Sequence, residues 1–76
     1  MDKQARLTAL HLAMSECKDA QEQCTYSARL ALEKQEYDHL TKNAEKLRYL
    51  HMHMKDLIVE AKRLEEMIEE EIKEIL

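Results

Sequence analysis

The sequence predicts an all-α fold, an antiparallel helical hairpin of two long helices that dimerises into a four-helix bundle or coiled coil. Three observations predict it. The 76 residues include no glycine or proline and a single asparagine, Asn43, so tight turns between strands have no residues to form them. The second half carries a wide stripe of Leu, Ile and Met at helical spacing. The first half carries a column of small residues that can cover part of that stripe.

The first helix is predicted over residues 3–34. The apolar residues of segment 3–14 are distributed all around the predicted helix, which is typical of a segment buried on more than one side. Mostly small side chains then follow on one face: Leu10, Cys17, Cys24 and Ala31. Such a face lets the backbone of a second helix approach closely. A capping pattern at Asp19–Glu22 leaves a break within this helix open as an alternative.

The turn is predicted at about residues 34–37. The small column of the first helix would continue at Asp38, whereas the strong column of the second half begins at Leu40. This shift of two is not one of the insertions of three or four residues found in continuous coiled coils. A different seam, through Tyr26, Leu30 and Tyr37, keeps helical spacing across the same region, so a continuous rod is the alternative. We favour the hairpin because a rod leaves the first helix unpaired.

The second helix is predicted over residues 37–76, about 60 Å long at the rise of an α-helix. Its apolar face has three neighbouring columns. The first is Leu40, Leu47, Met54, Ala61, Ile68 and Ile75; the second, four residues on, is Ala44, His51, Ile58, Glu65 and Ile72; the third is Leu50, Leu57 and Leu64. Folding the chain near residue 35 sets Cys24 against Leu47 and Cys17 against Met54, so that small residues meet large ones.

Charge divides the second helix into two segments. From His39 to Arg63, six basic residues stand against three acidic ones, a net charge of +3. From Leu64 to Leu76, one lysine stands against six glutamates, a net charge of −5. Acidic side chains are unfavourable at a helix C-terminus, where the macrodipole is negative. Because the first helix is shorter than the second, we expect the end of the chain, from about Glu69, to extend beyond it or to meet another chain. Its isoleucines beside this acidic charge favour a partner, so we expect the end to form an association surface.

These patterns predict a protein–protein interaction module: an adaptor, a co-chaperone or a small regulator. One helix of small residues cannot cover three apolar columns, so we expect a partner to cover the rest. The partner is a second copy of the chain, an amphipathic helix of another protein, or both. The predicted contact residues are Leu47, Leu50, Met54, Leu57, Ile58, Leu64, Ile68 and Ile72.

Composition argues against several other classes of function. The net charge of −4 does not provide the basic face that binds duplex nucleic acid. No segment approaches the roughly 18 apolar residues of a membrane span, so no membrane partner is expected. Residues 1–14 lack a small-residue cleavage site, so we expect no signal peptide. Two cysteines without such a signal indicate reduced thiols and a cytoplasmic location.

Metal binding is the main alternative function. His51 and His53 are two residues apart and point to different sides of a helix, so they cannot chelate one ion together. We expect His51 to be buried and hydrogen-bonded by a neighbour such as Gln21, and His53 to face outward. A soft-metal site would instead use Cys17, His51 and Met54. Beyond this alternative, no metal or other cofactor is expected.

A catalytic role is not expected. The segment Glu36-Tyr37-Asp38-His39 matches the Glu-x-x-His element of di-iron bundles, but it falls at the predicted turn. A chain without glycine cannot form a phosphate-binding glycine loop. A third hypothesis takes the glutamates between residues 65 and 74 as an acidic decoy for a nucleic-acid-binding protein.

The turn region carries a resemblance to a known family. The segment Gln35-Glu36-Tyr37, followed by Leu40, Ala44 and Leu47, resembles the start of the second helix in the small helical-hairpin co-chaperones of type III secretion needle subunits. The similar segment covers about a quarter of the chain. The resemblance implies a short cytoplasmic hairpin that keeps an aggregation-prone subunit unassembled.

Overall fold

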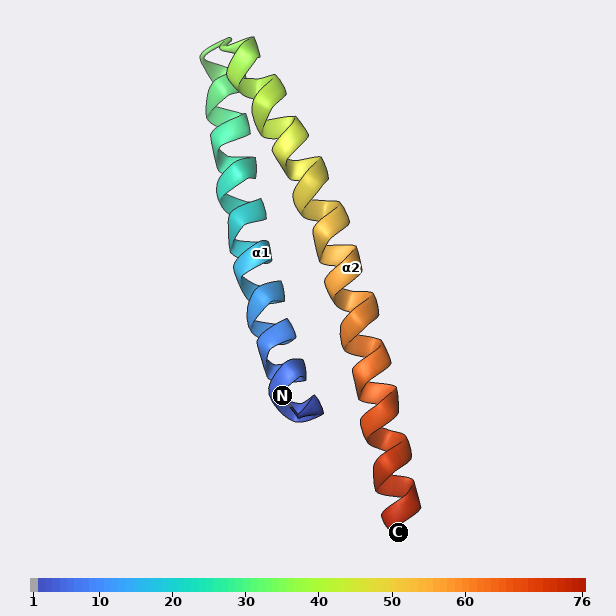
Figure 1. Ribbon diagram of the computed structural model, residues 1–76. Coiled ribbons are helices and arrows are strands. Elements are labelled where there is room, and N and C mark those ends of the chain that lie inside the picture. The colour runs from blue at the N-terminus through green and yellow to red at the C-terminus, as the bar shows by residue number, and fades with distance from the viewer. Residues whose placement is uncertain (1) are drawn as a thin grey trace.

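In the computed structural model, which describes residues 2–76, two long helices lie side by side and run in opposite directions (Figure 1). Helix α1 spans Lys3–Glu33 and helix α2 spans Tyr37–Ile75. Within residues 2–76 there is no strand. The predicted all-α hairpin is confirmed, and the continuous rod is wrong because the chain reverses at residues 34–36. The molecule measures 60 × 18 × 15 Å.

Helix α1 begins at a capped end and continues without a break. The carboxylate of Asp2 accepts a hydrogen bond from the Ala5 amide at 2.8 Å, which satisfies one of the free donors of the first turn. The alternative break at Asp19–Glu22 does not occur, because the helix runs through this segment. The expectation that residues 3–14 are buried on more than one side is wrong. Their outer side chains, including Leu12, are exposed because α2 covers α1 on one side alone.

The turn closes α1 with a left-handed residue. Gln35 has a φ of 59° and follows the C-cap residue Lys34. Its amide donates to the Leu32 carbonyl at 3.1 Å, and the Glu36 amide donates to the Ala31 carbonyl at 2.8 Å. This pair of bonds is a Schellman motif, which satisfies carbonyls that the helix end would otherwise leave free. Helix α2 starts directly afterwards.

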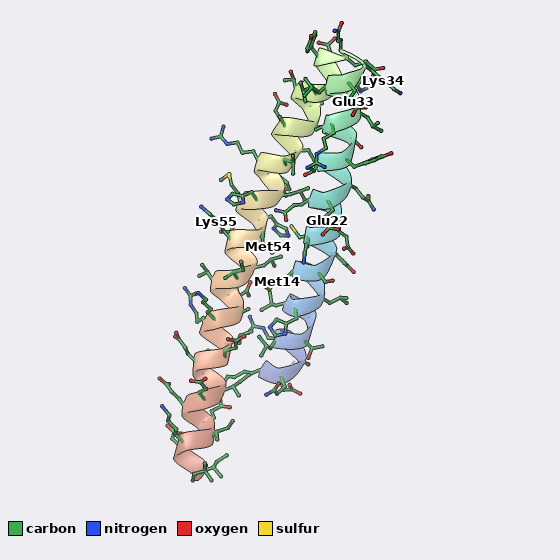
Figure 2. All side chains as sticks on the ribbon, turned by 180° about the vertical axis from the view of Figure 1, so that it is seen from behind. Met14, Glu22, Glu33, Lys34, Met54 and Lys55 are labelled. Atoms are coloured by element: carbon green, nitrogen blue, oxygen red, sulfur yellow. The ribbon has the colours of Figure 1, made fainter. Side chains whose placement is uncertain are left out.

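The packed seam consists of residues that alternate at spacings of three and four along both helices. In α1 it comprises Lys3, Leu7, Leu10, Met14, Cys17, Gln21, Cys24, Ala28 and Ala31. In α2 it comprises Leu40, Asn43, Leu47, Leu50, Met54, Leu57, Ala61, Leu64 and Ile68. Met14 and Met54, for example, lie between the two ribbons in Figure 2. All these side chains are buried or half-buried, so the first and third predicted columns of α2 face α1.

The thiols of two cysteines in α1 contact the backbone of α2 directly. The Cys24 thiol donates to the Asn43 carbonyl at 3.0 Å, and the Cys17 thiol donates to the Leu50 carbonyl at 3.4 Å. Both side chains are buried, and neither forms a disulfide. A larger side chain at these positions would separate the backbones, so the small face of α1 determines the interhelical distance.

Ion pairs join the helices at the open end of the hairpin. Lys3 pairs with Glu71, and the Arg6 guanidinium lies 3.3 Å from the Glu60 carboxylate. The His11 imidazole lies 3.6 Å from the Glu65 carboxylate, which forms an ion pair when the ring is protonated. All six side chains are partly exposed, so each pair contributes about 0–1 kcal/mol. They align the start of α1 with the last part of α2.

Candidate functional site

The eight predicted contact residues divide into three groups by exposure. Leu57 and Leu64 are buried in the seam, with 8% and 3% of their surface exposed. Ile72 is 50% exposed. The others are half-buried: Leu47, Leu50, Met54, Ile58 and Ile68. Pairing with α1 therefore uses much of the predicted stripe, and the surface left for a partner is the edge of the seam and the end of α2.

The end of α2 lies beyond the cover that α1 provides. Lys3, the first residue of α1, pairs with Glu71, and α2 continues past it (Figure 1). We call residues 68–76 the tail. Within it Ile75 and Leu76 are 84% and 98% exposed. An overhang was expected from about Glu69, and every residue from Glu69 to Leu76 is exposed, whereas Ile68 is half-buried.

The tail combines these apolar side chains with acid. Ile68 and Ile75 continue the first column of α2, and Ile72 continues the second column. The glutamates of the tail are Glu69, Glu70, Glu71 and Glu74, all exposed, and Lys73 is its one basic residue. The arrangement resembles half of a helix–helix contact, an apolar stripe bordered by charges of one sign.

The seam has an open edge along the second column of α2, which lies at the side of the apolar stripe. His51, predicted to be buried beside Gln21, is exposed, so that prediction is wrong. Around the helix the first column lies between the third and the second, so α1, which packs on the first and third columns, leaves the second column at the side uncovered. Ile58 is the apolar member of this column that stays half-buried. His53, predicted to face outward, is exposed, and its ring stacks beside Tyr49 with centroids 6.3 Å apart.

The residues of the proposed metal site do not form a ligand set. Cys17 is buried with its thiol on a backbone carbonyl, Met54 is half-buried, and His51 is exposed to solvent. Across the part of the chain that the structure describes, no group of three or more His, Cys, Asp or Glu side chains is placed to hold a metal ion. The Glu36–His39 segment spans the turn and the first residues of α2, and all four side chains are exposed.

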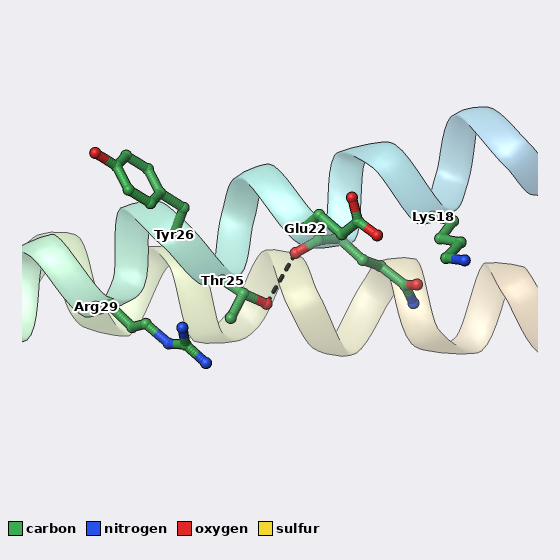
Figure 3. A pocket seen from close by; sticks show the side chains of 6 residues that line it. Lys18, Glu22, Thr25, Tyr26 and Arg29 are labelled. Carbon is green, nitrogen blue, oxygen red and sulfur yellow. Dashed lines mark hydrogen bonds between the residues drawn. The ribbon is translucent and has the colours of Figure 1, made fainter.

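One surface depression lies on α1 and is open to solvent. Its lining residues are Lys18, Gln21, Glu22, Thr25, Tyr26 and Arg29. Figure 3 shows the charged side chains and Tyr26 extending in different directions, and the Thr25 hydroxyl donates to the Gln21 carbonyl at 2.9 Å. Catalysis needs groups that converge on one reacting atom. This depression does not provide that convergence.

Sequence reasoning missed a set of exposed apolar residues on the outer side of α2. Tyr49, Met52 and Val59 lie away from α1 and are more than half exposed. Their spacings of three and seven were visible in the sequence, but the wider stripe on the other side of the helix dominated the pattern. They add to the apolar surface that the hairpin leaves open.

Comparison with known proteins finds no relative of this chain. No family model matches the chain, and neither a curated protein nor a solved structure matches it. The resemblance to secretion co-chaperones therefore stays a prediction. No helix within residues 2–76 has the length and apolar character needed to cross a membrane.

Proposed function

We propose that this chain is a protein–protein interaction module, an adaptor, co-chaperone or small regulator, that acts through the apolar face of α2. One observation carries the proposal: the apolar columns of α2 extend beyond the start of α1, so that Ile72, Ile75 and the C-cap residue Leu76 are exposed. Fully burying an aliphatic side chain stabilises a complex by about 1.5–3 kcal/mol. A partner helix that covers these residues would gain that stabilisation.

Self-association is the simplest use of the open edge of the seam. Six side chains in the hairpin are buried, and the rest of the seam stays half-buried, which is a small core for a chain of 76 residues. Two hairpins packed along their seam edges would form a four-helix bundle and enclose residues such as Leu47, Leu50 and Ile58. The free thiols of Cys17 and Cys24 support a reducing location, the cytoplasm.

Sedimentation velocity of the purified chain, combined with urea unfolding followed by circular dichroism, tests this proposal. We expect a dimer whose unfolding midpoint rises with protein concentration, because association stabilises the folded state by mass action. The variant Ile58→Ser should shift the chain toward monomer, and Val59→Ser, one residue away on the outer side of α2, should not. A cooperatively folded monomer that binds no amphipathic helix would refute the proposed function.

A further inference from the structure

Resting on the proposed function, we infer that the tail of α2 binds a cationic amphipathic helix of another protein. The bound helix would lie in line with α1, on the apolar face of α2 that α1 does not cover. The occupant of this face follows from three features: the direction of the apolar stripe, the sign of the surrounding charge and the place where α1 begins.

The first feature is the direction in which the tail presents its apolar side chains. Ile68 and Ile75 belong to the column that also includes Met54 and Ala61, which pack on α1. The apolar face of the tail is therefore a continuation of the seam, on the side where α1 would lie if it were longer. A second helix placed there would repeat the packing that α1 makes further along α2.

The second feature is charge, which favours a basic partner over a second copy. Residues 64–76 carry six glutamates and one lysine, a net charge of −5, and the negative end of the α2 dipole adds to it. Two such tails packed against each other would bring like charges together. Lys and Arg beside the apolar residues of a partner would complement the glutamates and set its orientation.

The third feature is the space next to the start of α1. An open surface depression lies there, lined by Asp2, Lys3, Gln4, Ile68 and Glu71. Ile68 is half-buried in it, while Ile75 and Leu76, beyond it, are almost fully exposed. A helix that starts at this depression and runs toward Leu76 would cover the apolar tail without displacing α1.

Binding of designed peptides to the full chain tests the inference. The probe is a fluorescein-labelled 18-residue peptide with Leu and Ile at spacings of three and four and Lys at the flanking positions. Two control peptides carry Glu in place of Lys, or the basic composition in scrambled order. We expect fluorescence anisotropy to show about tenfold tighter binding of the patterned basic peptide than of either control, because both charge and register contribute.

Variants of the chain locate the binding. The triple reversal Glu69→Lys, Glu70→Lys and Glu74→Lys should reverse the preference from the basic to the acidic peptide. A matched reversal at three exposed glutamates of α1, Glu16→Lys, Glu22→Lys and Glu33→Lys, changes the net charge equally and should preserve it. The pair Ile72→Ser and Ile75→Ser should weaken binding about tenfold or more, while Met52→Ser and Val59→Ser should leave it unchanged.

The outcomes separate this inference from the proposed function. Equal loss with both charge reversals, or equal binding of the patterned and scrambled peptides, would show a non-specific charge effect and overturn the inference. Absence of peptide binding in a chain that sediments as a dimer would also overturn it, while the proposed interaction module would stand. The exposed positions chosen lie outside the buried seam, and circular dichroism checks that each variant keeps its helices.

Discussion

Gln35 reverses the chain in a conformation that L-amino acids disfavour. Its φ of 59° lies in the left-handed region, where the side chain approaches the backbone, at a cost of roughly 1–2 kcal/mol that glycine does not incur. The Schellman hydrogen bonds from Gln35 and Glu36 hold the turn in this conformation. The sequence therefore has a turn of regular geometry without the residue that most often forms it.

Replacing Gln35 with glycine should stabilise the hairpin by about 0.5–1 kcal/mol, because relief of the left-handed strain exceeds the added flexibility of the unfolded chain. Urea unfolding followed by circular dichroism measures the change. Lys34→Gly is the matched control: Lys34 has a φ of −85°, so glycine there adds flexibility alone and should destabilise the protein. Destabilisation by Gln35→Gly would show that the turn differs from the one described.

Cys24 illustrates how the small face of α1 controls packing. Its thiol lies 3.0 Å from the Asn43 carbonyl, which leaves no room for a larger side chain. Cys24→Leu should lower the free energy of unfolding by about 1–3 kcal/mol through overpacking. Thermal unfolding measures the loss, and Ser27→Leu, at an exposed position nearby, should change stability by at most about 0.5 kcal/mol. Equal stability of the Cys24→Leu chain would contradict the close approach.

Helix α2 has two segments that differ in burial, and substitutions should separate their contributions to stability. Leu64→Ala in the seam should cost about 2–5 kcal/mol, because it leaves a cavity in the buried part of the interface. Ile75→Ala in the tail should change stability by at most about 0.5 kcal/mol. Chemical unfolding of both variants at one protein concentration measures the difference. A comparable loss for the two would mean that the tail is part of the fold.

The elements themselves could be predicted from the sequence to a large extent. The absence of glycine and proline indicated an all-α chain, and the shift between the columns at Asp38 and Leu40 indicated the place of the turn. The exposure of His51 could not be predicted from the sequence. Periodicity identifies three adjacent apolar columns, but the pairing of backbones around Cys17 and Cys24 decides which two face α1.

The candidate surface was predicted less completely than the fold. The overhang of α2 followed from the lengths of the two helices and from the glutamates after Leu64. The exposed residues on the outer side, such as Met52 and Val59, were missed because isolated apolar residues on a polar face are common in monomeric proteins. The helical period of this chain does not indicate the chemistry of the proposed partner, which we inferred from the placement of charge.

At the scale of the whole molecule, the proposed dimer has a distinctive shape. The hairpin is 60 Å long and 18 Å across its wider side. A four-helix bundle made by side-by-side packing should keep the length and increase the thickness. Small-angle X-ray scattering over a concentration series should show a longest dimension close to that of the monomer. A near doubling of this dimension would indicate end-to-end association through the tails and contradict packing along the seam.

The antiparallel arrangement of the two helices also determines how the molecule responds to mechanical force. The start of α1 and the end of α2 lie at the same end of the hairpin, far from the turn (Figure 1). Tension between the ends would separate the helices one seam layer at a time, and each step would break few contacts. Tension between Gln35 and Leu76 would instead pull along the axis of α2. A tether attached at the chain ends should therefore open the hairpin at low force, with Arg6 and Glu60 parting before Cys24 and Asn43.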